Sequence, residues 1–350
     1  MQALRKTAPA PGVQMQHVAV PVPGPGEVLL RVCAAGVCGT DLHLADWTSS
    51  YHFVAPALPV TLGHEFSARV RGRGPGVDGL ADDTLVAVRP SVLCGACAAC
   101  RSGEADACTQ RRGIGVTRDG GFAPWVVVPA RNCVPVPEGI DAEVAAMTEP
   151  LTVSHEAVRT GDVRSGDRVL VLGPGNIGLG IALFARAAGA AAVIVAGRDD
   201  GQRLAVAQRM GFRDVVDFER ADMLETLAPH LARGKFDVVF EATGASAVIE
   251  PALRALQPHG TLVIVGIHPR PVPIDLTALV RNHQAIRGSY RAPEDAWAKV
   301  LAFVEREQDV VRHLITHRVA LAQAQEAFAL AYARRATKVI IQPDQHASEP

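Results

Sequence analysis

The sequence predicts an α/β protein that combines a doubly wound parallel sheet with a second domain rich in β-strands. Three observations support this prediction. Strand-like and helix-like segments alternate from about residue 168, and a glycine-rich turn at 173–178 follows the first of these strands. Residues 1 to about 150 are instead rich in Pro, Gly and Val. The 350 residues are enough for two such domains.

The first half of the chain contains short strands between turns. Apolar runs at 27–33, 66–70 and 85–88 are typical of strands, and several early prolines exclude a long helix there. Near the other end, helix-like stretches at 296–305 and 321–333 precede a strand at 338–341. We expect this tail to return to the first domain, which gives a β-rich domain of residues 1–150 and 288–350.

The middle of the chain, residues 151–287, forms the predicted parallel-sheet domain. A buried strand at 168–172 leads into a helix at 177–188 that ends at a glycine. The alternation then continues to the strand at 261–265. The later expected elements are strands at 192–196, 215–216, 236–240 and 261–265, with helices at 202–210, 222–232 and 246–256.

Composition excludes several classes of protein. Lys and Arg total 35 against 36 for Asp and Glu, a balance that argues against a partner made of nucleic acid or anionic membrane. No run approaches the roughly 18 apolar residues that span a bilayer. We recognise no signal peptide, so a cytoplasmic location is expected.

Four of the seven cysteines fall close together, as Cys94, Cys97, Cys100 and Cys108. Small residues separate them, as a tight metal-binding loop requires. Four thiolates at this spacing predict a structural Zn²⁺ site in a lobe at 94–108. An iron–sulfur cluster also uses four cysteines, but no second cluster motif is present.

The turn after the first parallel strand matches the dinucleotide-binding pattern G-x-G-x-x-G. Gly173 permits the tight turn, Gly175 admits a pyrophosphate, and Gly178 lets helix and strand pack closely. Asn176 and Ile177 complete this expected cofactor-binding segment. The alternative is a glycine-rich turn that binds no ligand.

A second group of metal-ligating residue types is dispersed along the first domain. Cys38, His64, Glu65 and Glu149 offer a sulfur, a nitrogen and carboxylate oxygens. Each one alone is compatible with an ordinary structural role. Together they suggest a catalytic zinc with three protein ligands and one open position.

These motifs together resemble the zinc-dependent medium-chain dehydrogenase/reductase family, over roughly residues 25–341. The segments 38–43, 63–65 and 149–151 are similar to those of the sorbitol (polyol) and L-threonine 3-dehydrogenase branch. The resemblance implies a GroES-like catalytic domain, a Rossmann-type nucleotide domain and two Zn²⁺ per chain. It makes Cys38 and His64 direct zinc ligands, while Glu65 and Glu149 share the remaining role, directly or through water.

The resemblance also implies a reaction, the exchange of hydride between a secondary alcohol and NAD(P). The substrate is a small-molecule polyol, cyclitol or amino alcohol, and L-threonine is one alternative. Thr40 and His43 match the family's proton relay, and Asp41 is expected to orient His64. Expected pocket residues are Trp47, Tyr51, Phe53 and Trp125, and we expect a homodimer or homotetramer.

The choice of dinucleotide rests on the end of the second parallel strand. The carboxylate expected there for NAD is replaced by Gly197, and Arg198 follows. With Arg203 nearby, this arrangement favours the 2′-phosphate of NADP. Asp199 and Asp200 offer an alternative that would restore NAD. The resemblance adds Thr243 to the cofactor-binding residues.

Two other classes of protein compete with this interpretation. A zinc-free quinone reductase of the same fold would lack both zinc motifs, which are present here. A non-catalytic zinc-binding regulator with this fold would have lost a ligand or a loop glycine, and none is missing.

Overall fold

A computed structural model describes residues 1–104, 107–219 and 221–343 of the chain. The chain forms two compact units, each described here by itself. Unit 1 contains Met1–Glu149, Trp297–Ala333 and the residues from Lys338 onward, and unit 2 contains Pro150–Ala296 and Arg334–Thr337. None of the helices in the described ranges is both long and apolar enough to span a membrane.

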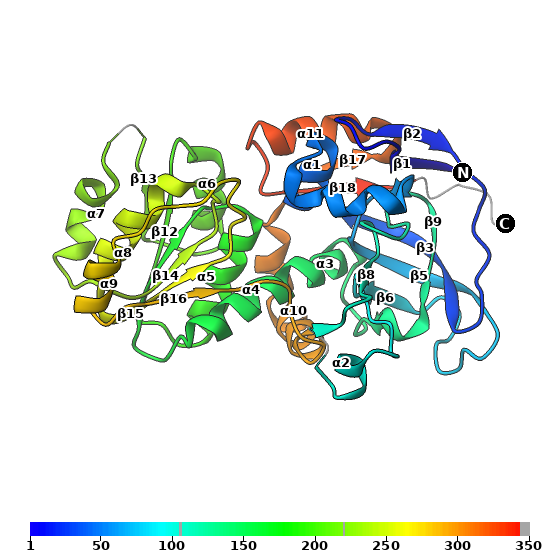
Figure 1. Ribbon diagram of the computed structural model, residues 1–350, viewed down its shortest axis with the longest axis horizontal. Helices are drawn as coiled ribbons and strands as arrows, with labels where there is room; N and C mark the ends of the chain where they lie inside the picture. The colour runs from blue at the N-terminus through cyan, green and yellow to red at the C-terminus, as the bar shows by residue number, and fades with distance from the viewer. Residues whose placement is uncertain (105–106, 220, 344–350) are drawn as a thin grey trace. The chain divides into compact units, whose positions relative to one another are not determined.

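Unit 1 is built mainly from β-strands, most of them short (Figure 1). Its strands are β1 (Gln2–Lys6), β2 (Gln14–His17), β3 (Glu27–Gly36), β4 (Val60–Thr61), β5 (Glu65–Arg73), β6 (Leu85–Val88), β7 (Ser91–Val92), β8 (Arg112–Gly113), β9 (Trp125–Pro129), β10 (Cys133–Pro135), β17 (Ile315–Ala320) and β18 (Lys338–Gln342). Its helices are α1 (Gly39–Asp46), η1 (Ser49–Ala57), α2 (Ala98–Arg101), η3 (Ala130–Asn132), α3 (Ala142–Ala146), nearly all of α10 (Ala296–Arg312), η5 (Leu321–Gln323) and α11 (Ala324–Tyr332).

The strand β3 organises unit 1. It pairs antiparallel with β5 and β9, and also with β18, the strand expected at 338–341. The register places Gly36 of β3 opposite both Glu65 of β5 and Ile340 of β18. Residues far apart in the sequence therefore meet beside the end of β3, just before α1 begins.

Unit 2 alternates strands and helices. Its strands are β11 (Arg168–Leu172), β12 (Ala192–Gly197), β13 (Val215–Asp217), β14 (Phe236–Glu241), β15 (Leu256–Ile264) and β16 (Ala285–Gly288). Its helices are α5 (Asn176–Ala187), α6 (Gly201–Arg209), α7 (Met223–Leu231), η4 (Ser246–Val248), α8 (Ile249–Ala255) and α9 (Leu276–Arg281), together with α4 (Thr148–Gly161), which enters from unit 1.

The sheet of unit 2 confirms the predicted fold class. Its six strands are all parallel and lie in the order β13-β12-β11-β14-β15-β16, which is the order of a Rossmann-type sheet. Strand β11 is apolar in four of its five residues and buried there, because both of its neighbours and the covering helices exclude water. The order reverses between β11 and β14, and ligands of such sheets bind at that point.

The ends of unit 2 differ from the sequence division at 151–287. The unit continues through Ala296, and it includes the later segment Arg334–Thr337. Helix α4 was not anticipated as an element, because the prolines and charges around residue 150 obscured its pattern. It begins with Thr148 and Glu149, so the expected metal-site glutamate lies in its first turn.

Gly178 offers a direct test of how tightly β11, the glycine turn and α5 pack. A Cβ atom at this position would lie 1.8 Å from the carbonyl oxygen of Gly173. We expect Gly178→Ala to lower the free energy of unfolding by about 1–3 kcal/mol, because the backbone must move apart. Chemical denaturation measures this change.

Gly201, the first residue of α6, is the matched control. A Cβ atom there meets nothing within 4 Å, and its φ is not in the left-handed region. We expect Gly201→Ala to be neutral or to stabilise unit 2 by up to about 1 kcal/mol. Equal effects of the two substitutions would contradict the close packing at Gly178.

Candidate metal and nucleotide sites

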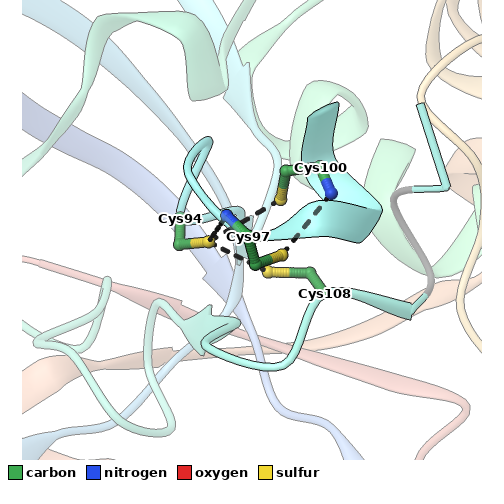
Figure 2. Close-up of side chains that lie close together, drawn as sticks. All are labelled: Cys94, Cys97, Cys100 and Cys108. Atoms are coloured by element: carbon green, nitrogen blue, oxygen red, sulfur yellow. Dashed lines mark hydrogen bonds between the residues drawn. The ribbon is translucent and has the colours of Figure 1, made fainter. Parts of the chain in front are cut away.

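The four clustered cysteines converge in the folded chain. Their sulfur atoms all lie within 4.8 Å of one another, around the short helix α2 (Figure 2). Backbone N–H groups of Ala96 and Cys97 point at the sulfur of Cys94, at 3.4 and 3.3 Å. The N–H of Cys100 likewise donates to Cys97, and this bond lowers the pKa of the Cys97 thiol to about 6. The N–H groups thus favour the thiolate of Cys97, whereas desolvation raises the pKa of the Cys100 thiol to about 12.

The sulfur separations fit a tetrahedral zinc ion. A zinc–sulfur distance of about 2.3 Å places the sulfurs of a tetrahedral site about 3.8 Å apart. The sulfur of Cys94 lies 3.8 Å from that of Cys100 and 3.7 Å from that of Cys108. All seven cysteines are free of disulfide bonds. The donor set and its spacing thus fit the structural zinc that the sequence predicts.

The second group of ligating atoms forms beside the end of β3. Cys38 precedes α1, His64 lies in the turn between β4 and β5, and Glu65 begins β5. Their ligating atoms lie within 4.8 Å of one another. Two ligands of one zinc, each at about 2.0–2.3 Å from the ion, are separated by less than about 4.6 Å, so this set also fits a zinc ion.

Asp41 contacts two of these residues. One carboxylate oxygen accepts a hydrogen bond from the backbone N–H of Cys38 at 2.9 Å. The other lies 3.6 Å from Nδ1 of His64. Asp41 is fully buried, so this contact takes place away from water. The contact is longer than a hydrogen bond, and neither of its two atoms has a hydrogen-bond partner among the described residues, so the orienting role of Asp41 stays a prediction.

Electrostatics in this group reflect a surplus of acidic residues. Burial lowers the pKa of His64, but Asp41 and Cys38 outweigh burial and raise it well above its usual value. Burial, followed by the charge of Glu65, raises the pKa of Glu149 to about 7. Glu149 lies outside the tight set of Cys38, His64 and Glu65, yet it is close enough to respond to their charges. A bound cation would relieve this repulsion.

Lys338 is the residue of this group that sequence reasoning missed. Its Nζ donates to a carboxylate oxygen of Glu65 and, at 2.9 Å, to the carbonyl of Val37. Burial lowers the pKa of Lys338, but the carboxylate of Glu65 more than compensates and raises it. Lys338 is the first residue of β18 and is only 4 % exposed. No local signal marks it, because only the pairing of β18 with β3 brings it here.

The expected proton relay is only partly connected. Thr40 and His43 both lie on α1, but the partner of the Thr40 hydroxyl is the hydroxyl of Tyr51, at 3.0 Å. The ring of Tyr51 stacks on that of His43 with centroids 5.7 Å apart. Tyr51 therefore links the two predicted residues, although the sequence suggested it only as a pocket residue. Trp125, another expected pocket residue, is 2 % exposed and belongs to the core of unit 1.

The glycine turn in unit 2 has the features of a phosphate site. Gly173 adopts φ +106°, and helix α5 starts at Asn176 with no side chain capping its N-terminus. Both amide atoms of the Asn176 side chain are buried without a hydrogen-bond partner among the described residues. A Cβ atom on Gly173 would lie 2.9 Å from Thr243, which follows β14. The uncapped N–H groups of α5 and the unpartnered amide atoms of Asn176 thus lie where the strand order reverses, between β11 and β14. A bound dinucleotide requires free donors at this point.

The residues that follow β12 are held by close packing and by an ion pair. A Cβ on Gly197 would lie within 3.0 Å of Asp200 and Pro174. Arg198 and Asp199 are exposed, whereas Asp200 is buried and pairs with Arg203 at 2.7 Å. The predicted ribose residues therefore follow one another along the chain: Gly197 ends β12, Arg198 lies in the loop and Arg203 lies in the first turn of α6. Asp200 already has an internal partner.

Two family models match parts of this chain. Residues 24–138 match the family described as "Alcohol dehydrogenase GroES-like domain", and residues 176–306 match "Zinc-binding dehydrogenase". An L-threonine 3-dehydrogenase of Pyrococcus abyssi is 35% identical over 347 residues, covering 97% of this chain and 98% of that protein.

Solved structures agree with these matches. A protein of Sinorhizobium meliloti described as a zinc-binding dehydrogenase bound to NADP is 31% identical, with a TM-score of 0.88 over 98% of this chain and 99% of that one. The 2R,3R-butanediol dehydrogenase of Bacillus subtilis is 26% identical, with a TM-score of 0.86 and the same coverage. The non-catalytic alternative is therefore set aside. The chain belongs to the zinc-dependent medium-chain dehydrogenases, in the branch that contains the L-threonine and sorbitol dehydrogenases.

Proposed function

We propose that this enzyme oxidises a secondary alcohol to a ketone with NADP as hydride acceptor, using unit 1 for catalysis and unit 2 for the dinucleotide. The observation that carries the proposal is the convergence of Cys38, His64 and Glu65 at one point of unit 1. The uncapped glycine turn of unit 2 supports it independently.

We assign two zinc ions to each chain. Cys94, Cys97, Cys100 and Cys108 hold the structural ion. Cys38 and His64 hold the catalytic one, with Glu65 or Glu149 as the carboxylate ligand, directly or through water. A zinc ion in the catalytic position supplies a Lewis acid that makes an alcohol proton acidic at neutral pH.

The protein's own groups then handle the proton. In the proposed relay, Thr40 takes the alcohol proton as its own hydroxyl proton passes to the hydroxyl of Tyr51, 3.0 Å away. The ring of His43 stacks on that of Tyr51 and lies 3.5 Å from the hydroxyl of Thr48. We propose His43 as the outer base, which receives the proton through a solvent molecule.

The substrate we favour first is an amino alcohol related to L-threonine. The basis is the match over 97% of the chain to an L-threonine 3-dehydrogenase at 35% identity. A polyol or vicinal diol is the second candidate, because the butanediol dehydrogenase has the same architecture. Reduction of NADP with L-threonine, 2,3-butanediol and a panel of polyols and cyclitols distinguishes these substrates.

We also propose that the enzyme works as a homodimer or homotetramer in the cytoplasm. Strand β16 is an edge of the unit 2 sheet among the described residues, and exposed apolar side chains lie close to it in sequence. Leu276 is 67% exposed, Val280 68% and Tyr290 68%. A second copy would cover this apolar edge. Seven free cysteines support a reducing compartment.

Cys100→Ser tests the structural zinc. Removing one thiolate should reduce the zinc content from two ions per chain to one and lower the melting temperature by several degrees, because a structural metal contributes folding free energy. Elemental analysis and calorimetry measure both effects. Cys33→Ser, outside both ligand groups, is the control and should retain two ions. Fewer than two zinc ions in carefully prepared wild-type protein would contradict the assignment.

His64→Ala tests the catalytic zinc. We expect turnover to fall at least about a thousandfold, because several kcal/mol of charge stabilisation are lost. Dinucleotide binding should persist, since the glycine turn belongs to the other unit. His43→Ala should cost only about tenfold to a hundredfold, mainly at lower pH, where solvent base is scarce. Steady-state rates and a binding titration measure these effects, with exposed His17→Ala as the control. A near-normal rate in His64→Ala would exclude a catalytic metal at this site.

Arg198→Ala tests the choice of dinucleotide. We expect the wild-type enzyme to have a lower Michaelis constant for NADP than for NAD. Arg198→Ala should weaken NADP about tenfold and leave NAD unchanged, because only NADP carries a 2′-phosphate for the guanidinium. A tenfold wild-type preference for NAD, with Arg198→Ala silent toward both, would show that a carboxylate recognises the ribose.

A further inference from the structure

The loop between β12 and α6 is held in place by one carboxylate. Asp217, at the end of β13, accepts backbone N–H bonds from Asp199 at 2.8 Å, Asp200 at 3.0 Å and Glu219 at 3.1 Å. Asp217 therefore uses both of its carboxylate oxygens in shaping the loop. Arg198 is fixed at its base, where its Nε donates to the carbonyl of Glu219 at 3.1 Å.

Asp200 lies between two arginines that are distant in sequence. One of its oxygens accepts from Nε of Arg203 at 2.7 Å, and the other accepts from Nη2 of Arg334 at 2.7 Å. The Asp200 side chain is only 2% exposed, so both contacts are shielded from water. A carboxylate with both oxygens occupied and buried in this way is not available to bind ribose hydroxyls.

Arg334 belongs to the same unit although it follows α11. It lies in the segment Arg334–Thr337, and its Nη2 also lies 3.5 Å from the carbonyl oxygen of Arg198. Its side chain is 58% exposed, whereas that of Arg203 is 15% exposed. A Cβ on Gly175 would lie 3.5 Å from Nη1 of Arg203, so Arg203 reaches the glycine turn. The loop, the turn and Arg334 thus surround one location.

Open donor edges of arginines remain at this location. Arg198, Arg203 and Arg334 bring three positive charges, and four carboxylates stand nearby, those of Asp199, Asp200, Asp217 and Glu219. Asp200 and Asp217 already accept hydrogen bonds within the protein, and Asp199 and Glu219 are exposed to solvent. Among the described residues, Nε and Nη1 of Arg334 and both Nη atoms of Arg198 have no hydrogen-bond partner. Anchored guanidinium groups with open donor edges are suited to a phosphate dianion.

We infer that Arg334 is a third arginine of the site for the adenosine 2′-phosphate, and that Asp200 anchors Arg203 and Arg334 instead of binding ribose. The inference rests on the proposed binding of NADP and adds a specificity-determining residue from a different part of the chain. It also removes Asp200 from the alternative in which a carboxylate selects NAD.

Arg334→Ala tests this inference through binding alone. Calorimetry with NADPH, NADH, 2′,5′-ADP and 5′-AMP isolates the 2′-phosphate without any need for turnover. We expect affinity for NADPH and 2′,5′-ADP to fall about tenfold, with NADH and 5′-AMP unchanged. Arg334→Lys keeps the charge but not the planar pair of donors, and should recover part of the loss.

Arg335→Ala is the matched control, because it removes the same charge from the next residue, which is exposed and has no contact with Asp200 among the described residues. Arg334→Ala could weaken 2′,5′-ADP and 5′-AMP equally, or weaken neither. Either result would overturn the inference about Arg334. The proposed cofactor would still stand if the wild-type enzyme preferred NADPH to NADH. A wild-type preference for NADH, with selective loss of NADH in Asp199→Asn, would overturn both.

Discussion

The buried ion pair between Lys338 and Glu65 is the interaction on which unit 1 depends. Cys38, Asp41, Glu65 and Glu149 bring four acidic groups into a small buried region, and such a region is stable only if cations compensate it. Lys338 provides one fixed positive charge, and a metal ion held by Cys38, His64 and Glu65 would add to it. This requirement explains why β18 returns to pair with β3, and why Gly36 stands where β3 meets both partners: a Cβ there would lie 2.5 Å from Glu65 and 3.2 Å from Lys338.

Buried and bonded carboxylates also position groups in unit 2. Asp200 holds Arg203 and Arg334, and Asp217 holds the backbone of the loop after β12. The glycine turn presents uncapped N–H groups, and the amide of Asn176 adds two unpartnered atoms. Unit 1 thus offers acidic groups that suit a cation, and unit 2 offers open N–H and guanidinium donors that suit a phosphorylated dinucleotide.

The sequence was sufficient for features that depend on local spacing. The cysteine lobe, the turn from Gly173 to Gly178 and the alternation of strands and helices all lie within short windows, and the structure contains each of them. The parallel-sheet fold class followed from the same local patterns. Residues that act through tertiary pairing were not predictable: Lys338 joins the metal ligands only through the β18–β3 register, and Arg334 joins the loop after β12 only because its segment packs in unit 2. Tyr51 was visible but was assigned to a pocket, since nothing in its neighbourhood showed that its hydroxyl meets Thr40.

The discontinuity of unit 1 has a consequence for biosynthesis. Unit 2 is inserted between the two parts of unit 1, and β18 is translated after all of unit 2. Domains tend to fold as units in the order in which the ribosome releases them, so the parallel sheet can form while the metal-ligand region still lacks Lys338. During that interval Cys38, His64 and Glu65 are present without their protein cation, and zinc acquired then would substitute for the missing charge. Arg334 and Lys338 are separated only by Arg335–Thr337, so a single short stretch of nascent chain supplies a charged residue to the ligand region of each unit.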